Sequence, residues 1–244
     1  MLRIESEIRG SEGTVTLSNL ARGTQLYVPG DPSDRVFILD QGRVKISVLG
    51  PGGKHCVYQV VEAGEIFGEG ALLGERLRAA TAEVIERASV VMAPRDSVLQ
   101  YADRNPRFWQ AFAPLLGQRI QRLEDQVQWV SLLEVEQRIA RLLLRWVDNL
   151  PPSSVPLANS FIRLSQKDLA GLIGATRETT SNALNRLQRK DCIEIRRRRI
   201  SVRSVEELMR HGGALPVFKL GPLRETDMQE PVKEADDRTR AARA

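Results

Sequence analysis

Residues 164–184 of the chain read LSQKDLAGLIGATRETTSNAL, and this stretch decides the fold of the C-terminal part. Ser165 and Asp168 have the S-x-x-[DE] spacing of a capping box ahead of an apolar run, which predicts the start of a helix. Gly174 suits the left-handed turn that ends such a helix. Because Thr176 is placed to cap a second helix, we predict two short helices joined by a glycine turn, which is a helix-turn-helix.

The second helix of this motif is predicted from residue 177 to about residue 190. Its predicted buried face comprises Ala183, Leu184 and Leu187. In a helix-turn-helix the start of this helix enters the major groove of DNA. There an arginine such as Arg177 can bond guanine O6 and N7, and a carboxylate such as Glu178 can accept from cytosine N4. Phosphates repel a carboxylate, so Glu178 in a basic segment indicates base readout.

A basic hairpin is predicted directly after this helix. Residues 193–195 and 200–202 alternate as strands around Arg196, Arg197, Arg198 and Arg199, which predicts a wing whose arginines face phosphate. Residues 160–203 carry 11 Lys and Arg against 4 Asp and Glu, whereas the whole chain has a net charge of only +5. Alone, such an excess is more often a solvated face than a nucleic-acid site. Here the capping box, the glycine turn, the Arg-Glu helix start and the basic wing follow in the order of a winged helix, which favours a polyanionic partner over the alternative, an amphipathic helix pair with a solvated basic turn.

Short apolar runs rich in β-branched residues occupy the N-terminal part, at residues 36–39, 44–48 and 57–61. The predicted turns between strands are Pro29-Gly30-Asp31, Gln41-Gly42, Pro51-Gly52-Gly53 and Ala63-Gly64. Several short strands with turns about every 8–12 residues predict a sandwich or barrel-like roll. His55 follows the third turn, where we expect an exposed polar residue rather than a haem ligand.

A narrow apolar seam follows the predicted roll, with spacings of four, three, four and three residues: Leu116, Ile120, Leu123, Val127 and Val130. Such an a/d seam, flanked by charged residues, is typical of a short coiled coil. Its narrowness favours packing on a second copy of the chain over packing on its own domain. We therefore expect a homodimer.

The pattern changes again beyond Glu134, where the apolar face widens to Val135, Ile139, Leu142, Leu143 and Trp146. This width predicts a helix buried in a domain, which Pro151-Pro152 ends. From Gly212 onward the composition predicts a mostly disordered tail. The predicted division is a β-roll sensing domain at 1–114, a dimerisation helix and hinge at 115–150, a winged helix-turn-helix at 151–210 and the tail at 211–244.

A second cluster of small residues reads FGEGAL at 67–72 and RAAT at 78–81. A glycine turn beside small residues leaves backbone N–H groups free to form an anion-binding concavity. Arg78 can neutralise a phosphate there with its forked donors, and Glu69 can accept a hydrogen bond from a ribose hydroxyl. The cluster therefore predicts a site for a phosphorylated small molecule.

Composition excludes several other functions. Only two cysteines occur, Cys56 and Cys192, without CxxC spacing, so no cysteine-only zinc or iron–sulfur site fits in one chain. Even with His55 and His211 we expect no metal. No apolar run approaches roughly 18 residues and the N-terminus lacks a secretory pattern, so we expect a cytoplasmic protein without a membrane partner. No nucleophile–base pair, HExxH or Walker motif points to an enzyme.

Residues 164–202 resemble the DNA-binding domain of the CRP/FNR superfamily of bacterial transcription regulators. The resemblance implies an α+β protein with an N-terminal β-roll of jelly-roll type, a long dimerisation helix and a winged helix-turn-helix. Its implied partners are palindromic double-stranded DNA, a second copy of the chain and RNA polymerase. In that family the residues matching Arg177, Glu178, Ser181 and Asn182 carry base readout. Since arginine is usual at position 182, the half-site preference there does not carry over.

Residues 67–81 resemble the phosphate-binding cassette of cyclic-nucleotide-binding domains, within a domain resemblance that begins at about Leu20. The resemblance implies that Glu69 holds the ribose 2′-hydroxyl and Arg78 the cyclic phosphate. The implied backbone contacts come from Gly68, Ala71, Ala79 and Ala80. Alanine rather than threonine at position 79 is similar to cassettes that prefer cAMP over cGMP.

The cassette also departs from the family pattern. Gly70 stands where a large apolar residue is usual, and Arg76-Leu77 replaces the common x-Pro. The adenine-contacting positions of CRP correspond to Leu123 and Glu124, where CRP has hydroxyl residues, so base recognition does not carry over.

The predicted function is a sequence-specific transcription regulator controlled by a cyclic nucleotide, with cAMP favoured. One alternative is the same regulator with another small ligand, with none, or with a redox or gas signal; the lack of clustered cysteines argues against an oxygen-sensing cluster. An alternative of another class is a cyclic-nucleotide-binding regulatory subunit that acts on a protein partner. That subunit would show no salt-dependent affinity for duplex DNA.

Overall fold

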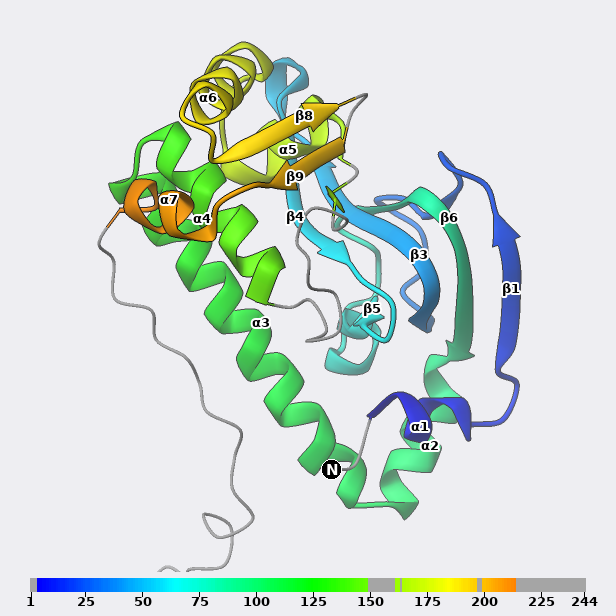
Figure 1. The fold of residues 1–244 in the computed structure, drawn as a ribbon. Coiled ribbons are helices and arrows are strands. Elements are labelled where there is room, and N and C mark those ends of the chain that lie inside the picture. Colours follow the sequence, from blue (N-terminus) through cyan, green and yellow to red (C-terminus); the bar gives the residue numbers. More distant parts are fainter. Residues whose placement is uncertain (1–3, 149–160, 163, 197–198, 214–244) are drawn as a thin grey trace, which may run out of the picture. The chain divides into compact units, whose positions relative to one another are not determined.

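An antiparallel six-stranded sheet forms the N-terminal part of the fold (Figure 1). The computed structural model describes residues 4–148, 161–162, 164–196 and 199–213. The strands of this sheet are β1 (Val15–Leu20), β2 (Gln25–Tyr27), β3 (Arg35–Leu49), β4 (His55–Val61), β5 (Ile66–Phe67) and β6 (Thr81–Pro94). Their order is β1-β6-β3-β4, with β2 paired to β6 and β5 paired to β3. The predicted β-roll is confirmed as an open sheet rather than a closed barrel.

Strand β3 continues through Gln41-Gly42, so the turn predicted there is wrong. Gly42 has a φ of 84°, and the pairing of β3 with β6 shifts register around it, which marks a β-bulge. A Cβ at this position would lie 2.1 Å from the carbonyl oxygen of Arg87. Glycine is therefore required by both its conformation and the close approach of the neighbouring strand, and the bulge bends the strand without ending it.

The core of the roll lies on both faces of β3. Val36 and Ile38 pack into one buried cluster, whereas Phe37 and Leu39 pack into another, as the two-residue period of a strand requires. The first cluster includes residues of three helices, α1 (Ile4–Arg9), α2 (Arg95–Arg104) and the start of α3 (Arg107–Leu132). The sequence patterns predicted neither α1 nor α2.

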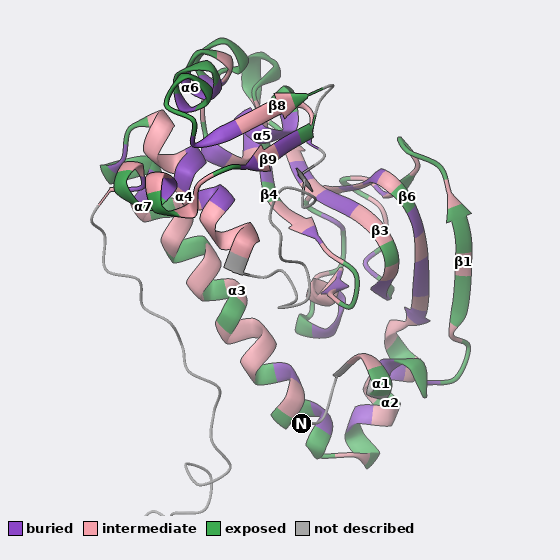
Figure 2. Ribbon diagram, in the orientation of Figure 1, coloured by how far each residue is buried: buried purple, intermediate pink, exposed green. Residues whose placement is uncertain are grey.

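Helix α3 carries the predicted seam. Exposed and half-buried residues alternate along most of this helix (Figure 2). Leu116 packs partly on the core of the roll. The other four seam residues are exposed: Ile120 (57%), Leu123 (51%), Val127 (66%) and Val130 (47%). An apolar stripe of this length on one helix is the feature of α3 that a partner helix would cover.

Helix α4 (Val135–Asp148) follows a sharp corner after α3. Its predicted wide apolar face is confirmed, since Ile139 and Leu143 are fully buried and the helix packs against the C-terminal helices. Arg138 closes the corner by donating to the carbonyl oxygens of Leu133 at 2.9 Å and Val130 at 2.8 Å. It also donates to the carbonyl of Ile173 at 3.1 Å, which ties the end of α3 to the helix-turn-helix.

The C-terminal part is the predicted winged helix-turn-helix. It consists of β7 (Phe161–Ile162), α5 (Gln166–Ile173), α6 (Arg177–Arg189), β8 (Ile193–Arg196), β9 (Arg199–Val202) and α7 (Val205–His211), with sheet order β7-β9-β8. The Ser165 hydroxyl accepts from the Asp168 N–H at 3.0 Å, and the Thr176 hydroxyl accepts from the Thr179 N–H at 3.1 Å. Both predicted caps are confirmed, as is the left-handed turn at Gly174. Helix α7 was not predicted.

Several predictions fall on residues outside the described ranges. These are the prolines at 151–152, Arg197 and Arg198 of the wing, and the tail from residue 214 onward. Among the helices that the structure describes, none has the length and apolar content to cross a membrane.

Candidate functional site

A cavity of about 440 Å³ lies between the sheet of the roll and α3. Six of the eight predicted ligand-binding residues line it: Gly68, Glu69, Arg78, Ala79, Ala80 and Leu123. The remaining two do not. Ala71 is buried in the core, and Glu124 is exposed on α3. The cavity therefore unites the cassette with the long helix, although the two segments are some forty residues apart in the sequence.

Arg78 is a buried cation at the wall of this cavity, with only 4% of the residue exposed. Its guanidinium donates to the carbonyl oxygens of Gly68, at 3.0 Å, and Arg35. It also lies 4.5 Å from the ring centroid of Tyr27, a cation–π distance. Its Nε has no hydrogen-bond partner. A buried cation at the wall of a cavity is suited to an anion, because burying an unpaired charge is costly.

Tyr27 adds a neutral phenol to the same wall. Burial raises the pKa of Tyr27 to about 12, against the opposing effect of the neighbouring Arg78. The hydroxyl therefore keeps its proton at neutral pH and can serve as a hydrogen-bond donor.

Glu69 is held by an arginine from the long helix. Nη1 of Arg119 lies 2.7 Å from Oε1 of Glu69 and donates to Oε1 of Gln59 at 2.7 Å. The same guanidinium also donates to the carbonyl oxygen of Ile66. Sequence reasoning missed Arg119, although it precedes Leu123 by four residues and so lies on the same face of α3. This contact joins the predicted ribose-binding carboxylate to α3.

The predicted base-reading residues lie together at the start of α6. Arg177, Glu178 and Asn182 are exposed and Ser181 is half-buried, while the opposite face of the helix packs inward. The buried face predicted from Ala183, Leu184 and Leu187 is confirmed. Residues 176–179 are exposed, so the first turn of the helix and the positive end of its dipole lie at the surface.

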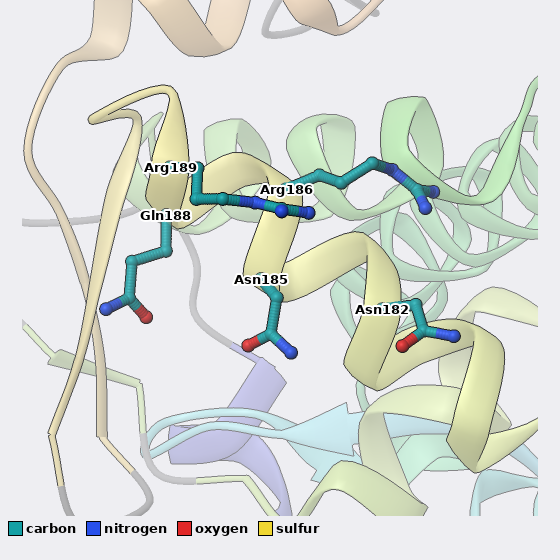
Figure 3. Close-up of a pocket in the computed structure, with 5 residues that line it drawn as sticks. All are labelled: Asn182, Asn185, Arg186, Gln188 and Arg189. Atoms are coloured by element: carbon teal, nitrogen blue, oxygen red, sulfur yellow. The ribbon is translucent and has the colours of Figure 1, made fainter.

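A surface hollow of about 600 Å³ continues along α6 beyond the predicted residues (Figure 3). Its lining comes from one helix: Asn182, Asn185, Arg186, Gln188 and Arg189. Arg186 donates to Glu136 of α4 at 2.7 Å and so holds the two helices together. Asn185 and Gln188 carry amides of the kind that bond adenine edges. Sequence reasoning missed them, although Asn185 follows Asn182 at the i, i+3 spacing of one helix face.

The wing is the hairpin of β8 and β9, in which Arg196 and Arg199 are directly opposite each other. The side chain of Arg196 is 79% exposed and is paired with Glu194. These two arginines flank the tip of the hairpin, and the two predicted arginines between them lie outside the described residues.

Helix α5 of the helix-turn-helix packs on β4 of the roll. Lys45 of β3 bridges the two parts, with its Nζ 2.8 Å from Asp168 and 3.2 Å from Glu83. Burial opposes ionisation of Asp168, but hydrogen bonds from Lys45 and Ser165 outweigh it and lower the pKa of this carboxyl. The buried cation of Lys45 thus joins the N-terminal roll to the helix-turn-helix.

This contact depends on a glycine in α5. A Cβ at Gly171 would lie 2.8 Å from Cγ2 of Val57 and 3.1 Å from Nδ1 of His55, so a larger residue would push α5 off β4. His55, predicted to be exposed, is instead half-buried beneath α5, and its Nδ1 has no hydrogen-bond partner. The prediction failed because the turn before His55 carries no signal that another part of the chain covers it.

Comparison with known proteins gives matches over both parts. Residues 17–105 match the cyclic nucleotide-binding domain family, and residues 137–211 match the Crp-like helix-turn-helix domain family. A CRP-like cAMP-activated global transcriptional regulator of Mycobacterium tuberculosis is 24% identical over 189 residues, which cover 78% of this chain and 84% of that protein. A global nitrogen regulator of Nostoc sp. is 27% identical over 194 residues, which cover 78% and 86%. The structure of FixK2 from Bradyrhizobium japonicum has the same fold, with a TM-score of 0.71 at 20% identity over 83% of this chain and 98% of FixK2.

A cyclic-nucleotide-binding fold joined to a helix-turn-helix defines a DNA-binding transcription regulator rather than an enzyme. The chain belongs to the CRP/FNR superfamily of transcription regulators.

Proposed function

We propose that this regulator binds palindromic DNA as a homodimer under the control of a cyclic nucleotide, with cAMP as the favoured effector. The observation that carries the effector assignment is the guanidinium of Arg78, a buried cation at the wall of a 440 Å³ cavity. A cyclic phosphate in this cavity would pair with the guanidinium, and the neighbouring Glu69 would accept from a ribose hydroxyl. The Mycobacterium tuberculosis relative is named as cAMP-activated, which supports the same ligand.

The proposed mechanism is a shift between two arrangements of the dimer. A ligand that bonds Glu69 competes for the carboxylate that Arg119 of α3 now holds, so ligand binding and the position of α3 are coupled. The favoured arrangement would set the two α6 helices about 34 Å apart, in successive major grooves. Arg177, Glu178, Ser181 and Asn182 would read bases, and the wing arginines would contact phosphate. We also propose RNA polymerase as a protein partner of the regulator, and the cytoplasm as its location.

We propose a domain division that assigns α4 to the DNA-binding unit rather than to the hinge. Residues 1–114 would form the sensing domain, 115–134 the dimerisation helix and hinge, 135–210 the winged-helix unit and 211–244 the tail. The packing of α4 on α5, α6 and α7 supports this boundary.

A second candidate effector class has support from one relative. The Nostoc protein is named as a nitrogen regulator, which supports an effector other than cAMP for a chain of this family. Another anionic metabolite that meets Arg78 would satisfy the same buried cation.

Calorimetric titration with cAMP and cGMP tests the effector assignment. We expect cAMP to bind, and Arg78→Leu to weaken it by about 10–150-fold, since a charge-assisted hydrogen bond is worth about 1.5–3 kcal/mol. Arg76→Leu is the matched control, because Arg76 is exposed in the same loop and does not line the cavity. If the wild type does not bind cAMP at millimolar concentration, the assignment of cAMP as the effector is wrong.

Fluorescence anisotropy with duplex DNA tests the class of protein separately. We expect a palindromic duplex to be bound more tightly with effector than without, and the affinity to fall with salt. A chain that bound cAMP but showed no salt-dependent affinity for any duplex would instead be a signalling subunit for a protein partner.

A further inference from the structure

The carboxylate of Glu75 lies against the groups that are proposed to bind the ligand phosphate. Its Oε1 accepts from the backbone N–H of Ala79 at 3.3 Å, and its Oε2 lies 3.8 Å from Nη1 of Arg78. Oε2 also accepts from the hydroxyl of Ser33 at 3.2 Å. Glu75 lines the cavity together with both anion-binding groups. An anion of the chain itself thus meets the guanidinium and the amide at one place.

The absence of a side chain at position 70 makes room for this carboxylate. A Cβ built on Gly70 would lie 2.1 Å from Oε2 of Glu75 and 3.0 Å from its Cδ. The backbone brings the two residues together, because the Glu75 N–H donates to the Gly70 carbonyl oxygen at 3.0 Å. The position of the Glu75 carboxylate therefore depends on glycine at position 70.

The two charges differ in how firmly they are held. The Arg78 side chain is 3% exposed, so its buried charge needs a partner in the folded state. The Glu75 side chain is 32% exposed and reaches the cavity from its edge, so it can turn outward into water. A carboxylate and a phosphate both suit the forked donors of arginine, and two anions cannot occupy one such position together.

We propose that Glu75 is an internal competitor for the phosphate subsite, and that it sets how strongly the cavity binds anionic ligands. Without ligand, Glu75 neutralises Arg78 and caps the Ala79 amide. An entering phosphate must displace it, so part of the phosphate's interaction energy is offset by the lost contacts of Glu75. An uncharged nucleoside can enter without displacing it. The proposal rests on the proposed function in assuming that the ligand is a phosphate ester.

Two independent variants remove the competitor without touching Arg78. Glu75→Gln keeps the shape and the acceptor for Ala79 but removes the charge. Gly70→Ala keeps the charge but its methyl group expels the carboxylate, whose end is flexible. The matched control is Glu65→Gln, which removes a carboxylate that pairs with Arg122 at 2.8 Å beside the same cavity but does not touch the cassette amides.

The experiment is calorimetric titration of the full chain with cAMP, inorganic phosphate and adenosine. We expect Glu75→Gln and Gly70→Ala to bind cAMP and inorganic phosphate about tenfold or more tighter than the wild type. Glu65→Gln should change the affinity by no more than about fivefold, the range of a weak ion pair. The affinity for adenosine should be the same in all four proteins.

Each outcome decides the proposal. If the wild type binds cAMP and neither variant binds it more tightly, Glu75 is not a competitor and the cAMP assignment stands alone. If no protein binds cAMP but both variants gain affinity for inorganic phosphate, the competitor is real and the cAMP assignment is wrong. If no variant gains affinity for either anion, the proposal is overturned. Should Glu75→Gln fail to fold, Gly70→Ala decides.

Discussion

At the scale of single residues, the arginines of the proposed DNA surface occupy two kinds of position. Arg177 is the first residue of α6, where a guanidinium can reach a guanine edge. We expect Arg177→Ala to cost about 1–3 kcal/mol on a cognate duplex and to relax the preference at one base pair per half-site. Binding to a scrambled duplex should stay nearly the same, because little of the non-specific affinity comes from base contacts. Anisotropy on both duplexes checks this.

Arg196 of the wing is the matched control for that experiment, because it is an exposed arginine on the hairpin and not on the helix that would read base edges. Arg196→Ala should weaken both duplexes alike and lower the salt slope by about one unit if the side chain contacts one phosphate. Glu178→Ala should relax discrimination and raise non-specific affinity, because it removes a repulsive carboxylate. If Arg177→Ala and Arg196→Ala shift both duplexes equally across a salt series, α6 is not the element that reads the bases.

The residues that sequence reasoning found and missed differ in how they reach their sites. Arg78, Glu69 and the start of α6 belong to local motifs, whose spacing is visible in the chain. Arg119 reaches the cavity only through tertiary structure, from a distant helix. Glu75 lies within the cassette, three residues before Arg78, and its carboxylate meets that arginine in a loop that folds back over Gly70. No local pattern marks a side chain whose partner lies across a cavity.

At the scale of elements, α5 is docked on the roll by the cluster of Lys45, Glu83 and Asp168. Asp168 has a lowered pKa, so its contribution to stability is present above its unfolded pKa of about 3.9 and is lost as pH falls through the folded value. Burial opposes the charge of Lys45, but hydrogen bonds to Asp168 and Glu83 raise its pKa. Its contribution is therefore present below about pH 10.4 and is lost as pH rises through the folded value.

Removing the cation should matter more than removing one anion. Lys45→Met leaves two carboxylates without their shared cation, and should cost about 3–5 kcal/mol of unfolding free energy at neutral pH. Asp168→Asn leaves Lys45 paired with Glu83 and keeps the backbone N–H that Ser165 caps, so about 1–3 kcal/mol is expected. Urea denaturation measures both. The control is Glu206→Gln in an exposed pair with Arg210, worth at most about 1 kcal/mol.

The pH profile separates this cluster from its histidine neighbour. The loss of unfolding free energy in Asp168→Asn, relative to the wild type, should stay constant at neutral pH. It should shrink below about pH 3.9, where the wild type loses the contribution of the Asp168 carboxylate itself. Burial, with Lys45 and Lys167 nearby, lowers the pKa of His55, so the folded state loses stability as pH falls below about 6.5. The profile is therefore measured on a His55→Gln background. A difference in unfolding free energy that persists unchanged into strong acid would show that the ionised Asp168 carboxylate is not its source.

Element boundaries show which signals in the sequence were reliable. The caps at Ser165 and Thr176 fixed the helix starts because each cap bonds a backbone group three residues away. Gly42 gave an equally strong local signal, but a turn and a bulge both require a left-handed glycine. Only the pairing of β3 with β6 distinguishes the two, and that pairing joins residues far apart in the sequence.

At the scale of the whole molecule, two strands connect the cavity to the reading part. Ile46 and Tyr58 line the cavity, while their neighbours Lys45 and Val57 contact α5. Because adjacent residues of a strand point to opposite faces, a ligand that moves β3 or β4 also moves the docking surface of α5. Leu123 connects the cavity to a different surface, since it lies both in the cavity wall and in the exposed seam of α3.

The exposed seam predicts the assembly itself. Ile120 and Val127 lie uncovered on one face of α3, so a partner α3 related by a twofold axis would bury each of them near its own counterpart. Replacing both by glutamate would place like charges face to face, and we expect size-exclusion chromatography with light scattering to show monomers. Leu132→Glu is the control, because Leu132 is equally exposed on α3 but lies on the side away from the seam.

The monomeric variant should also lose most of its affinity for a palindrome while keeping that for a half-site, since dimers gain by binding two half-sites at once. A wild type that is already monomeric at micromolar concentration, or a Leu132→Glu variant that dissociates as readily as the seam variant, would show that this stripe does not form the dimer.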